Sequence, residues 1–184
     1  MGTTSNFDSP AAASVSTSDT LPIISNATSR AATATVAQLL AGAAAVVAVT
    51  AGATVLALTQ AANAGRTTTI ASTTPIAITL PASSGSGALY RVVLLAAATA
   101  TAHTIKVANT VDAMTGLIVS LTTTAGVMIG FKNTLTDDTL TLNGTTTGGG
   151  IGAVYEFVDI KTGSYLVKGR DTAAMTTTPY SATV

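Results

Sequence analysis

Few residues of this chain could take part in chemistry, and the most conspicuous are acidic. Asp137-Asp138 is the only pair of adjacent carboxylates, and it comes just before a stretch with strand character. General acid–base catalysis needs two carboxyl groups aimed at one bond, whereas adjacent residues of a strand point to opposite faces. The pair is therefore typical of a turn. A calcium site is the alternative, although the spaced Asp and Asn ligands of an EF-hand loop do not accompany it.

The single histidine, His103, begins a predicted strand. A catalytic triad would need a nucleophile and an acid arranged around it, and the chain has no Gly-x-Ser-x-Gly elbow. We interpret His103 as a hydrogen-bonded structural residue. The alternative is a metal ion on a threefold axis, bound by one His103 from each of three subunits. The chain has no cysteine, which excludes disulfides, thiolate chemistry and cysteine-bound zinc.

Three consecutive glycines, Gly148-Gly149-Gly150, are a weak candidate for a phosphate-binding loop. No Lys-Ser or Lys-Thr pair accompanies them and no helical pattern follows, so the run instead favours a flexible hairpin connection between strands. The sequence therefore predicts no catalytic residue, no metal site and no cofactor. We expect that the protein is not an enzyme.

The composition is typical of a structural protein. Of the 184 residues, 37 are Thr and 35 are Ala, only 9% are charged, and eight basic side chains balance eight acidic ones. Such a chain lacks the basic surface that binds nucleic acid through its phosphates. Its mean hydropathy of +0.54 argues against global disorder, which combines low hydrophobicity with high net charge. Because the net charge is near zero, electrostatic repulsion does not oppose self-association.

Short β-strands separated by turn residues must position these side chains. Thr is β-branched, favours strands and keeps an uncharged face soluble. About ten short strands at roughly 8–12-residue spacing predict an all-β fold, an antiparallel β-sandwich or barrel. The Thr triplets recur at irregular spacing, so no solenoid-type repeat is predicted. The predicted strands lie within Val55–Thr59, Arg66–Ile70, Pro75–Pro81, Ala88–Ala98, His103–Asn109, Gly116–Thr122, Gly126–Asn133, Asp138–Gly144, Ile151–Lys161 and Gly163–Gly169.

One of these strands carries apolar groups on both faces, which is typical of a strand buried between two layers or lying at a subunit contact. We expect Tyr155, Phe157 and Tyr165 to form a subunit contact. These aromatic side chains, with Tyr90, could instead fill the core or offer a platform for stacking sugars. The first face of the strand carries Val154, Glu156, Val158 and Ile160, and the second carries Tyr155, Phe157 and Asp159.

The chain divides into four segments. Residues 1–35 are rich in Ser, Thr, Ala, Asn and Pro without any period, which predicts an extended N-terminal arm. Residues 36–54 form an Ala-rich connecting segment, residues 55–170 the β domain and residues 171–184 a C-terminal tail. Either the arm is a floppy terminus, or its apolar residues anchor it on a partner. Those residues are Phe7, Leu21, Pro22, Ile23 and Ile24.

A membrane anchor is a further alternative, because Val36–Leu58 is uncharged and long enough to span a bilayer. Its residues are mostly Ala, Gly and Thr, which insert weakly, and no Trp or Tyr lies near either end. We therefore expect no membrane contact. The pattern is better divided into a short Ala-rich helix over Ala31–Ala45 and two strands, Val46–Thr50 and Thr54–Thr59.

Several motifs of the β region resemble small virion proteins of tailed bacteriophages. A strand ending in Leu80-Pro81 leads through the Gly-rich run 82–87 into a strand with Tyr90-Arg91. The resemblance covers about residues 55–170 and does not include the first 54 residues. Its further pieces are Leu56–Thr59, Asn63–Thr67, His103–Ala108 and Thr139–Thr146.

The resemblance implies a head decoration, cement or fibre protein. Such a protein is a β-rich subunit, commonly a homotrimer, that clamps neighbouring major capsid subunits on the outer surface of the head. The expected partner is therefore the major capsid protein, bound through the β domain and the arm, and the expected location is the virion surface. A head or tail fibre module that binds a host receptor, or a glycan, is the alternative. The family has no catalytic residues to carry over, and we expect no nucleic-acid partner.

Overall fold

The computed structural model describes residues 20–25, 30–35, 46–49, 55–122, 124 and 126–183. The chain forms two compact units, residues 1–43 and 44–184. In the first unit, β1 (Thr20–Ser25) pairs with β2 (Arg30–Thr35) as an antiparallel two-stranded sheet. The predicted extended arm and Ala-rich helix are therefore wrong at these residues, where alternating Thr and Ala and two Ile residues favour strand pairing. The rest of both predicted segments lies outside the described residues.

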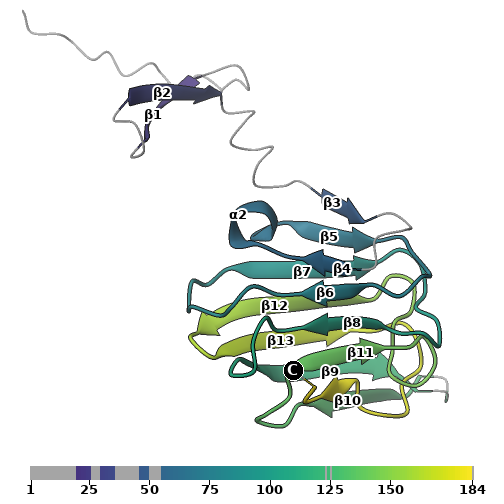
Figure 1. Ribbon diagram of the computed structural model, residues 1–184. Coiled ribbons are helices and arrows are strands. Elements are labelled where there is room, and N and C mark those ends of the chain that lie inside the picture. The colour runs from purple at the N-terminus through teal and green to yellow at the C-terminus, as the bar shows by residue number, and fades with distance from the viewer. Residues whose placement is uncertain are drawn as a thin grey trace, which may run out of the picture. The chain divides into compact units, whose positions relative to one another are not determined.

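The second unit consists almost entirely of β-strands, so the all-β prediction is confirmed. Its one helix among the described residues is the single turn α2 (Gln60–Asn63). Each of the ten predicted stretches overlaps a strand, and β14 lies within residues 171–184, the predicted C-terminal tail. The seven-stranded sheet has the order β10-β9-β13-β12-β7-β5-β3, and the five-stranded sheet has the order β14-β11-β8-β6-β4 (Figure 1).

The strands of the seven-stranded sheet, in chain order, are β3 (Val46–Val49), β5 (Thr67–Ile70), β7 (Leu89–Leu94), β9 (Ala113–Leu121), β10 (Met128–Lys132), β12 (Val154–Lys161) and β13 (Ser164–Arg170). Those of the five-stranded sheet are β4 (Val55–Ala57), β6 (Ala77–Thr79), β8 (His103–Lys106), β11 (Thr139–Leu142) and β14 (Tyr180–Ser181).

The strand pairing corrects the predicted antiparallel sandwich or barrel. Both sheets are mixed: β3, β5 and β7 run parallel, β4, β6 and β8 run parallel, and β9 is parallel to β13. From β3 to β8 the chain alternates between the two sheets, so in β3-β5-β7 and in β4-β6-β8 each strand's neighbour comes two strands later and runs in the same direction. β9 does not pair with β7, because β12 and β13 lie between them. Both sheets keep edge strands, so the described strands do not close a barrel.

Because of this alternation the chain returns to each sheet repeatedly, but after a different number of residues each time. In the seven-stranded sheet, Val46 pairs with Thr67, and Thr67 in turn pairs with Arg91. In the five-stranded sheet, Val55 pairs with Ala77, which is itself the partner of Thr104. The steps along the chain are unequal because helix α2 and loops of different length lie between the strands. The unequal steps explain why no repeat is visible in the sequence.

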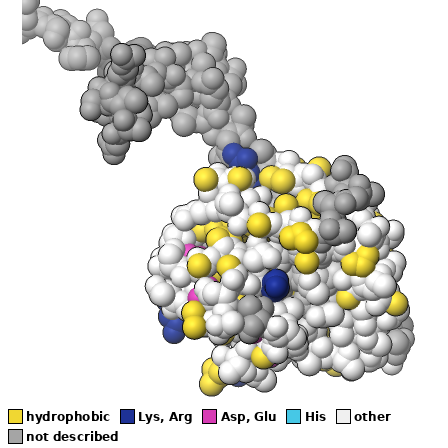
Figure 2. Space-filling model, viewed as in Figure 1, with side chains coloured by type: hydrophobic (Ala, Val, Ile, Leu, Met, Phe, Trp, Pro, Cys, Tyr) yellow, Lys and Arg dark blue, Asp and Glu magenta, His cyan; other side chains and the backbone are white. Residues whose placement is uncertain are grey.

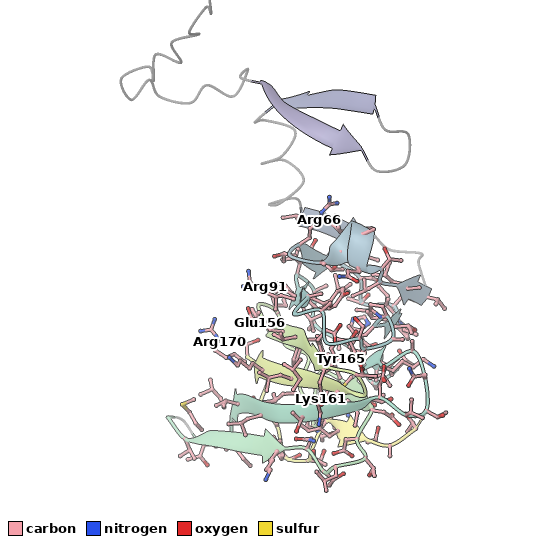
Figure 3. The ribbon with its side chains drawn as sticks, turned by 90° about the vertical axis from the view of Figure 1, so that its left-hand side faces the viewer. Arg66, Arg91, Glu156, Lys161, Tyr165 and Arg170 are labelled. Carbon is pink, nitrogen blue, oxygen red and sulfur yellow. The ribbon has the colours of Figure 1, made fainter. Side chains whose placement is uncertain are left out.

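One hydrophobic core contains side chains from both sheets. Tyr90 and Tyr165 meet edge to face with ring centroids 6.3 Å apart, and the Tyr165 hydroxyl donates to the carbonyl of Pro81 (2.8 Å). Tyr155, Phe157 and Tyr165 are fully buried, and Figure 3 shows Tyr165 inside the domain. The predicted subunit contact at these three residues is therefore wrong, because their side chains pack within their own chain.

A glycine is required where β9 runs beside β13. Gly116 has a φ of +152°, and an added Cβ would lie 1.8 Å from the carbonyl oxygen of Val167 on β13. The Gly116 amide donates to Oδ1 of Asn133 (2.8 Å), which also binds the backbone carbonyl of Met114 through its side-chain amide. Gly116 therefore allows the two parallel strands to approach at this irregular point.

We expect Gly116→Ala to lower the free energy of unfolding by at least about 3 kcal/mol, because the methyl group would force β13 away from β9. Gly87→Ala is the matched control. Gly87 also has a positive φ, +73°, but nothing lies within 4 Å of its added Cβ, so the cost is about 1 kcal/mol. Urea unfolding measures both variants. Equal unfolding midpoints would contradict the close approach of the two strands.

Candidate functional site

The predicted acid pair lies just after a turn and holds local structure. Asp137 and Asp138 are buried at the start of β11. The Asp137 carboxylate accepts the N–H of Thr134 (2.5 Å), and that of Asp138 accepts the N–H of Thr183 (2.9 Å) and the hydroxyl of Thr139 (2.7 Å). Both carboxylates are engaged with neighbouring loops. Among the described residues, no group of three His, Asp or Glu side chains is placed to hold a metal ion.

His103 is a structural residue on the inner face of β8. Its side chain is only 2% exposed, and its Nδ1 accepts the N–H of Ile76 (3.1 Å), which leaves the proton on Nε2. Burial lowers the pKa of the imidazole, against a smaller opposing effect of the Ser72 backbone, so the ring is neutral at pH 7. A ring buried in this way cannot share a metal ion with two other subunits. The threefold-axis alternative is therefore wrong.

The three glycines connect β11 to β12, but the predicted flexible hairpin is wrong: the two strands lie in different sheets, and Asp171 holds the glycines in place. The buried carboxylate accepts the N–H groups of Gly149 (2.6 Å) and Gly150 (3.1 Å), and the hydroxyl of Tyr155 donates to it. Burial, reinforced by the charge of Asp171, raises the pKa of Tyr155 well above its usual range. An added Cβ at Gly148 would lie 2.3 Å from the same carboxylate. The loop is thus built around an acid of its own chain.

The Gly-rich run 82–87 is held in the same way by Asp159. The carboxylate accepts the N–H groups of Ser84, Gly85 and Ser86 at 2.7 to 3.1 Å and the hydroxyls of Ser84 (3.0 Å) and Ser86 (2.7 Å). Burial raises the pKa of Asp159, but the Ser86 hydroxyl and these N–H groups outweigh it and bring the pKa to about 2. Sequence reasoning missed this role. The available signal was a carboxylate on the aromatic, inward face of β12.

All five aspartates of residues 44–184 are therefore buried in the fold. Asp112 completes the set by accepting the N–H of Ser83 (2.7 Å). The sixth acid, Glu156, lies on the outer face in an ion pair with Arg91 (2.7 Å). None of the seven Lys and Arg residues of this unit, all of which the structure describes, is buried. A chain with a formal net charge of zero thus presents mainly positive groups at the surface of its β domain.

The outer face of the seven-stranded sheet combines these positive groups with aliphatic side chains. The alternation along β12 is as predicted, with residues 155, 157 and 159 buried and residues 154, 156 and 158 on the outer side. A groove of about 630 Å³ crosses this face over β9, β12 and β13. We call it the outer groove, and its main lining side chains are Leu117, Val119, Val154, Glu156, Leu166, Lys168 and Arg170.

The outer face of the five-stranded sheet has a different character. Its register places Thr79, Thr104 and Thr141 on the outer side, together with Ala77 and Lys106. In Figure 2, where this face is turned to the viewer, non-hydrophobic atoms prevail and hydrophobic side chains form scattered groups. The β domain therefore has one Thr-rich face, at whose edge β4 exposes Val55 (68%), and one apolar face that carries Lys and Arg.

The predicted arm contacts fall in the first unit. Leu21, Pro22, Ile23 and Ile24 lie in β1, where they pair with residues 31–34 of β2, and Phe7 lies outside the described residues. Most of the stretch 36–58 also lies outside them. In the part of the chain that is described, no helix is long and apolar enough to cross a membrane.

Comparisons with protein-family models, with curated proteins and with solved structures gave no match.

We expect Asp159→Asn to lower the free energy of unfolding by about 3 kcal/mol at pH 7, because an amide NH₂ would face backbone donors that now bind a carboxylate. The folded pKa of Asp159, about 2, lies below its ordinary value of 3.8. Its contribution is thus complete above about pH 4 and is lost as the pH falls toward 2. Urea midpoints measured between pH 7 and pH 2 test this.

Glu156→Gln is the matched control, since it removes the charge of an exposed ion pair, and it should cost less than about 1 kcal/mol. If Glu156→Gln lowers the stability as much as Asp159→Asn does, the hydrogen bonds of residues 84–86 to Asp159 contribute no more to stability than an exposed ion pair. The account is also contradicted if the stability of the Asp159→Asn variant falls as steeply between pH 4 and pH 2 as that of the native chain.

Proposed function

We propose that the protein is a structural virion protein that decorates the outer face of a phage head. In this role it clamps neighbouring major capsid subunits, as a homotrimer, and has no enzymatic activity. The observation that carries the proposal is the contrast between the two outer faces of the β domain. A decoration protein attaches through one side and meets water on the other, and the outer groove and the Thr-rich face suit those two tasks.

The groove supplies the kind of surface that attachment requires. Exposed apolar patches rimmed by polar residues mark interaction sites on soluble proteins. Leu117 is 47% exposed on the outer face, beside the half-buried Val119, Val154 and Leu166. The buried aspartates support the same role, because they hold the loops around the sheets in fixed positions and so keep the attachment face rigid.

In this proposal the first unit makes a second contact with the head, through Phe7 and the β1 residues Leu21 to Ile24. Because β1 is already paired with β2, docking it costs less than ordering a free segment, which takes roughly 1–2 kcal/mol per residue of backbone entropy. Three such units on one trimer bind together, since binding of the first raises the effective concentration of the others. The first unit and the outer groove would then act together.

A receptor-binding module of a head or tail fibre is the second candidate. The observation that favours it is the volume of the outer groove, about 630 Å³, which is within the range of sites for small ligands. All four tyrosines are buried, so the groove offers aliphatic side chains rather than aromatic rings for stacking on a sugar.

The proposal predicts that the full-length protein has the mass of a trimer in solution and co-sediments with undecorated heads of the phage that encodes it. Ile23→Asp combined with Ile24→Asp should weaken head binding at least about tenfold, or about 1.4 kcal/mol, because it places charges among the arm contacts. Thr33→Asp, on the partner strand β2, is the control and should bind within about twofold of the native chain. A monomer that leaves the heads bare would overturn the proposal.

A further inference from the structure

We infer that the outer groove binds a protein surface that presents carboxylates interleaved with aliphatic side chains. The inference rests on the proposed function in one respect, since it identifies the partner surface as that of the major capsid protein. The charged and aliphatic side chains of the groove indicate the chemistry of the partner.

The register of the seven-stranded sheet lines up four charged residues of this face in one row. Lys132 on β10 is opposite Leu117 on β9, which is opposite Lys168 on β13; Lys168 is opposite Glu156 on β12, and Glu156 is opposite Arg91 on β7. Neighbouring strands are about 4.8 Å apart, so the positive groups recur about every 10 Å across the row. This regular spacing gives the face a pattern that a partner can match.

Arg170 adds a positive group in the next row, where the register places it between Val119 and Val154. Figure 3 shows Arg91 and Arg170 pointing away from the sheet on the same side of the molecule. Glu156 is the one acid on this face, and Arg91 binds it through two nitrogen atoms at 2.7 and 2.8 Å. No carboxylate among the described residues forms an ion pair with Lys168 or Arg170, so both remain available to a partner.

A partner of the groove must complement both its charged side chains and its aliphatic side chains. Carboxylates complement Lys168 and Arg170, and aliphatic groups complement Leu117 and Leu166, which line the same groove. A second copy of this chain docking through the same face would bring these positive groups against each other. Charge complementarity therefore favours a different protein with an acidic surface over a second copy of this chain.

Two other classes of partner fit less well. A lipid surface is bound by protruding side chains that often include aromatic rings, and no aromatic side chain lines the groove. Nucleic-acid sites combine positive groups with aromatic rings for stacking, and all four tyrosines of this chain are buried. A protein surface with acids and aliphatic groups matches both parts of the groove.

The test compares Lys168→Glu with Lys106→Glu. Both variants reverse one charge on a strand, but Lys168 lines the groove and Lys106 lies on the Thr-rich face. With undecorated heads, we expect Lys168→Glu to weaken binding at least about tenfold and the double variant Lys168→Glu/Arg170→Glu at least about a hundredfold. Lys106→Glu should bind within about twofold of the native chain. Thermal unfolding confirms that each variant is folded.

A peptide probe tests the groove without the head. A 12-residue peptide that alternates Glu and Val should shift the NMR amide signals of Leu117, Val119, Val154 and Leu166, and a peptide that alternates Lys and Val should not. The Lys168→Glu/Arg170→Glu variant should lose the response to the acidic peptide.

The outcomes separate the two proposals. If the native chain and Lys168→Glu bind heads equally well, the groove inference is overturned and the decoration role stands. If heads are not bound but the acidic peptide shifts the groove signals, the decoration role fails and the groove inference is supported. An acidic peptide that shifts no groove signal overturns the inference. Stronger responses at the same residues to anionic vesicles or to a DNA oligonucleotide overturn it as well.

Discussion

The structure of the β domain depends on hydrogen bonds between buried carboxylates and the N–H groups of loops. Successive strands of the chain often lie in different sheets, so the loops that join them cross from one sheet to the other. These loops are irregular, and their buried backbone N–H and C=O groups need hydrogen-bond partners. Aspartate is suited to this task, because one carboxylate can accept several N–H groups at once and such charge-assisted bonds are stronger than neutral ones. Asp159 and Asp171 each accept two or more loop amides, and Asp112 and the pair Asp137-Asp138 serve the neighbouring turns.

This use of acids has a consequence at the surface. Five of the six acids of this unit, all but Glu156, are buried, whereas every Lys and Arg of the unit remains at least partly exposed. Composition alone describes a neutral chain, but contact with a partner is governed by the groups that a partner can reach. The positive groups then gather on the apolar face because the register of β13 places Lys168 and Arg170 on the same side as Leu166. Although the chain has no net charge, the fold thus gives the outer face of the seven-stranded sheet an apolar and mainly positive character.

The strands could be predicted from the sequence, but their pairing could not. Alternation and turn residues are local signals, and they located all ten predicted strands of residues 55–170. Parallel pairing depends on where the chain goes between strands, and short connections suggested hairpins where the structure crosses between two sheets. The alternation along β12 separated its two faces correctly, yet both faces are apolar. Nothing local indicated that Tyr155 and Phe157 face the core while Val154 and Val158 face outward.

The candidate site shows the same division. Glycine-rich runs and acids were recognised as loop features, but their association was hidden, because Asp159 lies more than 70 residues from the loop it holds. Likewise, Leu117, Val154 and Leu166 come from three strands and form a groove only through the register of the sheet. The arm residues were chosen for their hydrophobicity alone, and their role stays a prediction.

Hydrogen exchange of individual amides at neutral pH tests the central claim most directly. Ser84, Gly85 and Ser86 lie in an exposed loop, yet their N–H groups bind the buried carboxylate of Asp159. We predict that these amides exchange at least about a hundredfold more slowly than in an unstructured peptide, as do amides within β-strands. The amide of Leu135, an exposed loop residue of the same domain, should exchange rapidly. Exchange of residues 84–86 at the rate of Leu135 would contradict the account.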